Sequence, residues 1–272
     1  MVKATTIVAG IALVLAGAPA LAQKQSNSDD SFTPARAEGY AAVTDWPDFT
    51  GVWSPDWAYL FASRGARRGS SPVLTPEAQA KYDAFLEKQK REGVNQYLQA
   101  NCIPPGMPGI MRQPYPVEFL FSPGRVTLLT ETYSQARRLY LDGRALPDDP
   151  EPLFNGTSVG RWEGDTLVVD TVGFNHLVTY QSGIEPSQNM RIHEHFWLAE
   201  PDVMMVETTI TDPGVLAEPL VQLQAYRRQP DWDMREYVCE ENNRLTDEEG
   251  GANIDLGFDE LDEDPFGPPP ED

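Results

Sequence analysis

Three acidic residues lie in stretches that alternate like β-strands. Glu131, Asp170 and Glu194 each have apolar or aromatic residues two positions away on both sides. Residues two apart in a strand share a face, so we expect these carboxylates to point toward the apolar side of a sheet. Buried carboxylates need partners, and Arg144 and Arg161 are candidates. The pattern predicts either an acid–base site, with Glu131 or Glu194 as base and Arg144 or Arg161 stabilising an oxyanion, or a structural ion pair or outer-face acid.

The three histidines raise the question of a metal site. His193 and His195 share one strand face and, with Glu200, match the middle of the first cupin metal motif, but no histidine follows residue 195 to supply the last ligand. His176 could complete a three-nitrogen zinc site. Surface histidines at a sheet edge are the simpler interpretation, so the sequence predicts no metal and leaves these three residues as weak candidates.

The sequence gives little support for a serine nucleophile or for phosphate binding. The Gly-Thr-Ser-Val-Gly segment at 156–160 lacks the strand–turn–helix context of a nucleophile elbow. No Walker or Gly-x-Gly-x-x-Gly pattern occurs in the chain. We therefore expect no nucleotide and no other cofactor.

Aromatic residues supply a second kind of candidate site. The chain contains 11 Phe, 10 Tyr and 6 Trp, enough to line a pocket for a ring-containing or apolar molecule as well as to build a core. The ligand-binding candidates are Trp57, Tyr115, Tyr133, Trp162, Asp170 and Trp197. Core packing is the simpler interpretation for part of the aromatic set, and the better one for Trp53.

The elements that position these residues are predicted to be mostly strands, separated by short links rich in turn residues. The expected strands are Phe49–Ser54, Val117–Phe121, Val126–Tyr133, Arg138–Leu141, Ser158–Trp162, Thr166–Val172, Met190–Leu198, Val203–Thr211, Leu220–Arg228 and Arg235–Cys239. A helix is predicted from Pro76, capped by Thr75, to Gly93. Because no helices separate the strands, we expect a mainly β fold, an antiparallel up-and-down β-barrel with one or two peripheral helices.

The chain ends predict export. Residues 1–22 have a basic start, an apolar run and small residues before Gln23, which is typical of a cleaved signal peptide. We expect a disordered leader at 23–44, a single β-barrel domain at 45–246 and an acidic disordered tail at 247–272, where eleven acids stand without Lys or Arg. The protein would be periplasmic or secreted. In such an oxidising compartment two cysteines most often pair, so we expect a disulfide between Cys102 and Cys239. A catalytic thiol or a metal ligand is the alternative.

Two resemblances support these expectations. Asp-Phe-Thr-Gly-Val-Trp at 48–53 resembles the Gly-x-Trp start of lipocalins and the wider calycin group, which implies that Trp53 plugs the closed end of a barrel and that Gly51 allows the turn beneath it. Segments such as Gly-Arg-Trp-Glu-Gly-Asp-Thr-Leu-Val-Val at 160–169 are similar to an uncharacterised family of secreted bacterial proteins. This second resemblance covers most of 45–244, and it implies export and a Cys102–Cys239 disulfide but no particular activity.

Charge narrows the partners. A formal net charge of -21 argues against nucleic acid and against anionic lipid surfaces, and no membrane span is expected after cleavage. We expect the barrel interior to bind a hydrophobic or aromatic small molecule. The alternatives are a cofactor-independent lyase, isomerase or hydrolase that uses interior carboxylate and arginine groups, or a structural envelope protein. The sequence indicates no particular oligomeric state.

Overall fold

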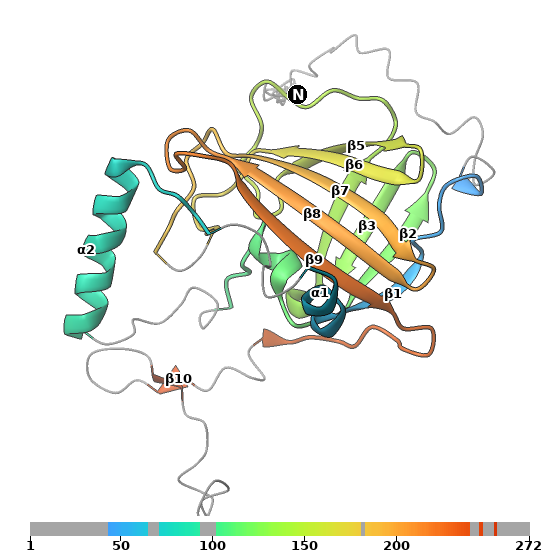
Figure 1. Cartoon of the computed structure of the whole chain (residues 1–272), viewed down its shortest axis with the longest axis horizontal. Helices are drawn as coiled ribbons and strands as arrows, with labels where there is room; N and C mark the ends of the chain where they lie inside the picture. Colours follow the sequence, from blue (N-terminus) through green and yellow to red (C-terminus); the bar gives the residue numbers. More distant parts are fainter. Residues whose placement is uncertain are drawn as a thin grey trace, which may run out of the picture. The chain divides into compact units, whose positions relative to one another are not determined.

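The chain folds as a closed β-barrel. The computed structural model describes residues 43–64, 71–92, 102–180, 183–239, 245–246 and 253–254. Within them, nine strands follow one another around the barrel in chain order, and the last pairs with the first (Figure 1). The mainly β barrel fold predicted from the sequence is confirmed. The predicted signal peptide, nearly all of the leader and most of the acidic tail lie outside the described residues.

The elements are as follows. The barrel strands are β1 (Gly51–Pro55), β2 (Val117–Ser122), β3 (Arg125–Thr130), β4 (Gln135–Tyr140), β5 (Thr157–Glu163), β6 (Thr166–Val172), β7 (Arg191–Glu200), β8 (Val203–Thr211) and β9 (Leu220–Arg228). The short strands β10 (Leu245–Thr246) and β11 (Asn253–Ile254) pair with each other. The helices are α1 (Trp57–Arg64) and α2 (Pro76–Glu92), with short 3-10 turns η3 (Gly109–Arg112) and η4 (Thr132–Ser134).

One strand pair departs from the antiparallel order. Strands β4 and β5 are parallel, with Leu139 opposite Ser158 and Tyr140 opposite Val159. A parallel pair requires the connecting chain to return to the end of the sheet from which the first strand started. Residues 141–156 make that return, which hairpin signals alone do not reveal.

The prediction of a strand at Arg235–Cys239 is wrong. The described residues from 229 to 239 contain no strand. The reason lies in the closure of the barrel: β1 pairs with β2 on one side and with β9 on the other. No free strand edge remains beside β9 for a tenth barrel strand to join.

The barrel interior is filled by alternate residues of the strands. Trp53 is fully buried, and its indole N–H donates to the carbonyl of Phe49 at 2.9 Å. The guanidinium of Arg228 lies 4.4 Å from the Trp53 ring centroid. Gly51, two residues earlier, has a φ of 95°, which only glycine adopts without strain. Trp53 therefore belongs to the core.

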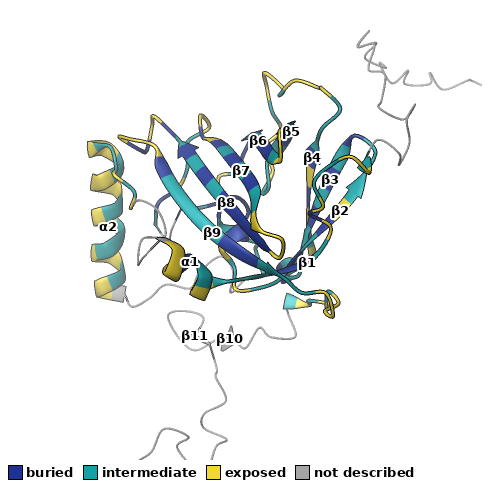
Figure 2. Cartoon of the chain, turned by 45° about the vertical axis from the view of Figure 1, so that its right-hand side comes forward, coloured by how far each residue is buried: buried dark blue, intermediate teal, exposed yellow. Residues whose placement is uncertain are grey.

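Both helices lie outside the barrel (Figure 2). The N-cap predicted for α2 is present, because the Ala78 backbone N–H donates to the Thr75 hydroxyl at 3.3 Å. Helix α2 contacts the core through Ala78 and Tyr82. Helix α1 lies against β9 (Figure 1) and buries Leu60 among side chains of the outer barrel surface. None of the helices in the described part is long and apolar enough to cross a membrane.

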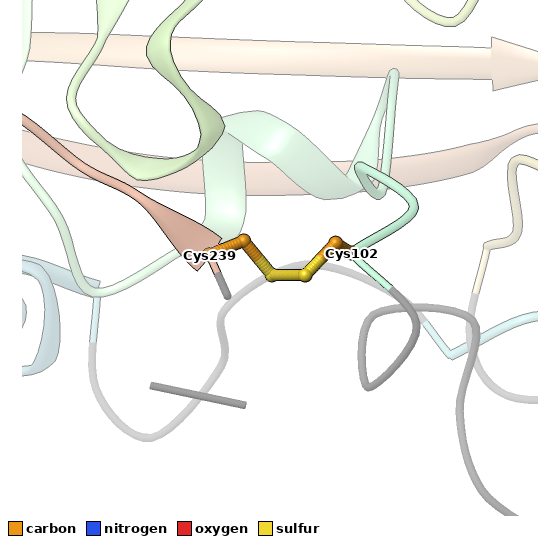
Figure 3. Close-up of a disulfide and its surroundings, with 2 residues drawn as sticks. All are labelled: Cys102 and Cys239. Carbon is orange, nitrogen blue, oxygen red and sulfur yellow. A yellow bond between two sulfur atoms is a disulfide. The ribbon is translucent and has the colours of Figure 1, made fainter. Parts of the chain in front are cut away.

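The segment between α2 and β2 enters the core. We call residues 103–113 the plug, since Met107, Ile110 and Met111 are buried in the main hydrophobic cluster. Just before the plug, Cys102 forms a disulfide with Cys239, with Cα atoms 5.6 Å apart (Figure 3). The pairing expected for the two cysteines is confirmed. The disulfide thus fastens the start of the plug to the segment that follows β9.

Candidate functional site

A charged pair lies inside the barrel. Arg137 on β4 and Glu194 on β7 are joined by two hydrogen bonds, one of them 3.1 Å from Nη1 to Oε1. The same guanidinium donates to the hydroxyls of Ser158, at 3.3 Å, and Thr171, at 2.9 Å. The side chains of Arg137 and Glu194 are 2% and 0% exposed. Four strands, β4 to β7, are therefore held together by one polar cluster.

The burial of this cluster defines its role. Glu194 has no accessible surface, so it borders neither solvent nor a void that could hold a water molecule, and its partners Arg137, Ser158 and Thr171 are also buried. Burial raises the pKa of the neighbouring Tyr226, and the negative charge of Glu194 raises it further. The Tyr226 hydroxyl donates to the Met111 carbonyl, so it also ties β9 to the plug. The arrangement supports an internal ion pair that fixes the strands rather than a place where substrate arrives.

The sequence placed Glu194 inside correctly but missed its partner. Arg137 and Arg138 are adjacent, and a shift of one residue in the strand exchanges the face on which each lies. The structure sets Arg137 opposite Leu128 and therefore on the inner face. The alternation of Arg137 with Leu139 is the signal that could have identified it.

A second expected carboxylate, Asp170, faces outward instead. It lies opposite His193, whose Nδ1 is 2.6 Å from an Asp170 carboxylate oxygen. Arg161 donates to the second oxygen at 3.2 Å. The ring of His195 is 4.7 Å from that of His193, between centroids. No group of His, Cys, Asp and Glu that could hold a metal ion is found where the structure describes the chain.

Several further candidates are dispersed over the barrel. Arg144 donates to Asp142 at 2.9 Å and stacks on Tyr140, 3.7 Å from the ring centroid. Trp57 lies on α1, and Trp162 packs against Phe49 with 5.2 Å between ring centroids. Trp197 packs on the outer barrel surface, in the cluster that contains Leu60. His176 lies in the loop after β6. The structure does not bring Trp57, Trp162 and Trp197 together in one site.

A pocket of about 530 Å³ lies where three segments meet, next to the barrel end at which β2 begins and β3 ends. We call it the rim pocket. Its lining residues are Pro114, Tyr115, Pro116, Glu131, Asp231, Trp232, Asp233 and Arg235. The segments are joined directly: the Glu131 backbone N–H donates to Pro116 at 3.0 Å, and the Arg235 backbone N–H donates to the Glu131 carboxylate at 2.9 Å.

A change of backbone conformation after β3 creates one wall of the rim pocket. The strand ends at Thr130, earlier than expected, because Glu131 already has helical backbone angles, with φ of -61° and ψ of -51°. Tyr133 and Ser134 then adopt left-handed conformations with φ of 57° and 47°. Such conformations are costly for residues other than glycine and gather at functional sites. The inner face of β3 carries Val126, Leu128 and Thr130, so Leu129 and Glu131 are out of phase with it, and the inward placement expected for Glu131 is wrong.

Three tyrosines pack together at this wall, and one of them, Tyr115, also lines the pocket. The ring of Tyr237 is 5.8 Å from that of Tyr115 and 5.3 Å from that of Tyr133, between centroids. Burial raises the pKa of Tyr133 to about 12, with further contributions from Tyr237 and Tyr115. Tyr133 therefore keeps its proton across the physiological range. The cluster places aromatic rings beside the rim pocket.

The rim pocket unites two residues that the sequence identified for different reasons. Glu131 was a candidate base and Tyr115 a candidate ligand contact, and both line it. The sequence reasoning missed Trp232 and the charged residues beside it. Trp232 is 51% exposed, and a large aromatic residue between two aspartates in a turn-rich segment is the signal that was available.

Comparison with known proteins adds no assignment. A scan against models of protein families finds no match to this chain, and a search of curated proteins finds none either.

Proposed function

We propose that this protein is an exported barrel that binds a small molecule with an aromatic or apolar body, and that the molecule lies in the rim pocket. The observation that carries the proposal is the pocket itself. Its volume of about 530 Å³ lies within the roughly 300–1,000 Å³ of small-molecule sites. Tyr115, Trp232 and two prolines offer apolar and aromatic surface, and four charged residues offer polar contacts.

The burial of the barrel interior favours the rim pocket over the interior as the binding place. The described interior side chains with no exposed surface include Leu128, Leu139, Phe196, Met204 and Val206. A ligand among them would have to displace packed core, at a cost of several kcal/mol per large side chain. The rim pocket needs no such displacement.

Export is supported by two features. Residues 1–22 have the composition of a cleaved signal peptide, and disulfides such as Cys102–Cys239 persist in oxidising compartments. We expect the mass of the mature protein, recovered from periplasm or medium after expression of the full chain, to correspond to a chain that begins at Gln23. A chain that retains residues 1–22 in the cytoplasm would contradict export.

Binding is tested by calorimetric titration with para-tert-butylphenol, a compact molecule with an aromatic ring and an apolar group. We expect saturable binding to the wild-type protein and at least about tenfold weaker binding to Trp232→Ala, because the indole is a principal contact surface. Trp57→Ala is the matched control, since Trp57 is 40% exposed but lies on α1, outside the pocket lining. Absence of binding, or an equal loss in both variants, would contradict the proposal.

A further inference from the structure

We propose that the rim pocket selects organic cations, that is, molecules that combine an aromatic or apolar body with an ammonium-type charge. This inference rests on the proposed function, because it specifies the ligand of the same pocket. It is carried by the charge of the lining residues together with the aromatic surfaces among them.

Negative charge predominates around the rim pocket. Three carboxylates line it, those of Glu131, Asp231 and Asp233, against one guanidinium, that of Arg235. The Glu131 carboxylate is held at the wall by the Arg235 backbone N–H, at 2.9 Å. An anionic ligand could use Arg235 but would meet three like charges. The net charge of -21 for the whole chain adds a field that raises the local concentration of cations.

Aromatic surfaces complement this charge. The face of an aromatic ring attracts a cation through its quadrupole, and tryptophan does so most strongly. Trp232 is half exposed at the pocket, and Tyr115 lines it with Tyr237 packed behind. A cation with an apolar body gains from ring faces and carboxylates together, whereas a neutral molecule of the same shape gains only from the apolar and aromatic contacts.

The experiment compares three probes that share a phenol ring and differ in charge. They are para-hydroxyphenyltrimethylammonium, its neutral isostere para-tert-butylphenol, and para-hydroxybenzenesulfonate, titrated calorimetrically into the full mature chain in mildly acidic buffer, where all three phenols are protonated. We expect the cation to bind about tenfold more tightly than the neutral isostere, and the sulfonate to bind most weakly. We also expect the preference for the cation to fall with added salt, since the pocket is open to screening.

Paired variants separate local from global charge. The double variant Asp231→Asn/Asp233→Asn should lower the affinity for the cation about tenfold and leave that for para-tert-butylphenol unchanged. The control Asp148→Asn/Asp149→Asn removes the same charge from exposed positions outside the pocket lining and should alter neither. Melting temperatures of both variants verify that they fold.

The outcomes distinguish the two proposals. If none of the probes binds, the proposed binding function itself fails. If para-tert-butylphenol binds as tightly as the cation, or if the Asp231/Asp233 variant keeps the full preference for the cation, the pocket remains a binding site but the inference about charge is overturned. Tightest binding of the sulfonate would show that Arg235 dominates and would also overturn it.

Discussion

At the scale of single residues, the pair between Arg137 and Glu194 is the most buried ion pair among the described residues. Removing two charges from water costs several kcal/mol each, and their attraction offsets this only if the remaining polar atoms are also bonded. Ser158 and Thr171 supply those bonds. The pair is therefore expected to matter more for specifying the strand arrangement than for net stability.

Breaking this pair should be costly. Glu194→Gln leaves the Arg137 charge buried without its counterion, so we expect a loss of about 3–5 kcal/mol in the free energy of unfolding, measured by urea denaturation. The double variant Arg137→Met/Glu194→Leu removes both charges and should recover much of that loss. Glu163→Gln, in an exposed pair with Arg161, is the control and should cost at most about 0.5 kcal/mol. If Glu194→Gln and Glu163→Gln lower the free energy of unfolding by similarly small amounts, the structural role of the Arg137–Glu194 pair is contradicted.

A pH-dependent contribution is expected from Asp142. Burial by itself raises the pKa of this carboxyl, but hydrogen bonds from the Arg144 side chain and backbone outweigh it, so the pKa is lowered overall. A carboxyl with a lowered pKa in the folded state stabilises the protein above its unfolded pKa, about 3.9, and loses that effect as the pH falls through the folded pKa. Asp142→Asn should therefore lower the free energy of unfolding by about 1 kcal/mol at neutral pH. In urea titrations the difference should vanish near pH 2, and a difference that grows in acid would contradict this assignment.

At the scale of elements, the plug depends on a close approach of its backbone. Gly106 has a φ of 59°, and a Cβ built there would lie 2.4 Å from the Phe154 carbonyl oxygen and 2.4 Å from a methyl group of Val178. The neighbouring Met107 is fully buried. The plug can therefore enter the core along this path only with glycine at position 106.

Gly106→Ala should reveal this constraint. We expect a loss of about 3–4 kcal/mol in denaturant unfolding, from the positive φ and from the steric overlap together. Gly143→Ala isolates the first contribution, because Gly143 has a φ of 82° but open space around its Cβ position, and it should cost only about 1 kcal/mol. An equal loss of unfolding free energy in the two variants would show that the plug can shift to accommodate the added methyl group.

The disulfide is a second determinant at this scale. Cys102 and Cys239 are separated by 137 residues, and closing so long a loop is worth about 4–5 kcal/mol on the chain-entropy model. Free-thiol labelling of the unfolded, unreduced protein should give no signal, and Cys102→Ser/Cys239→Ser should lower stability substantially. Two reactive thiols per chain would refute the bridge in the purified protein.

At the scale of the whole molecule, acidity is distributed unevenly. Eleven of the 42 acidic residues lie between Asp247 and the end of the chain, where no Lys or Arg occurs. Little apolar area is available there to offset the entropy of ordering. The nine barrel strands are complete at Arg228, and Cys239 lies before this region. Folding of the barrel should not depend on it.

Truncation after Leu245 tests this independence. We expect the free energy of unfolding to change by at most about 0.5 kcal/mol, as for an ordinary surface segment, and the affinity for para-tert-butylphenol to remain the same. Thermal unfolding and calorimetry measure the two quantities. A fall of many degrees in the melting temperature, or lost binding, would mean that the tail covers the barrel or belongs to the site.

The sequence by itself determined the elements whose signals are local. Strands β8 and β9 match the expected ranges, Val203–Thr211 and Leu220–Arg228. Their apolar alternation and flanking turns depend only on residues close together in the sequence. The start of helix α2 at Pro76 is also a local signal, because Thr75 caps the helix N-terminus. Residue spacing also predicted correctly that Glu194 points into the barrel, with Ile192 and Phe196 on the same face.

Tertiary structure decided the facing of Asp170 and the assembly of the rim pocket. Leu167, Val168 and Val169 are all buried, so apolar alternation on β6 could not decide which face is internal. Pairing with β7 decided it by setting Val169 opposite Glu194. The rim pocket brings together 114–116, Glu131 and 231–235, which have no local relation in the sequence. They meet because the barrel closes β9 onto β1, and that closure requires a consistent tilt and register of all nine strands.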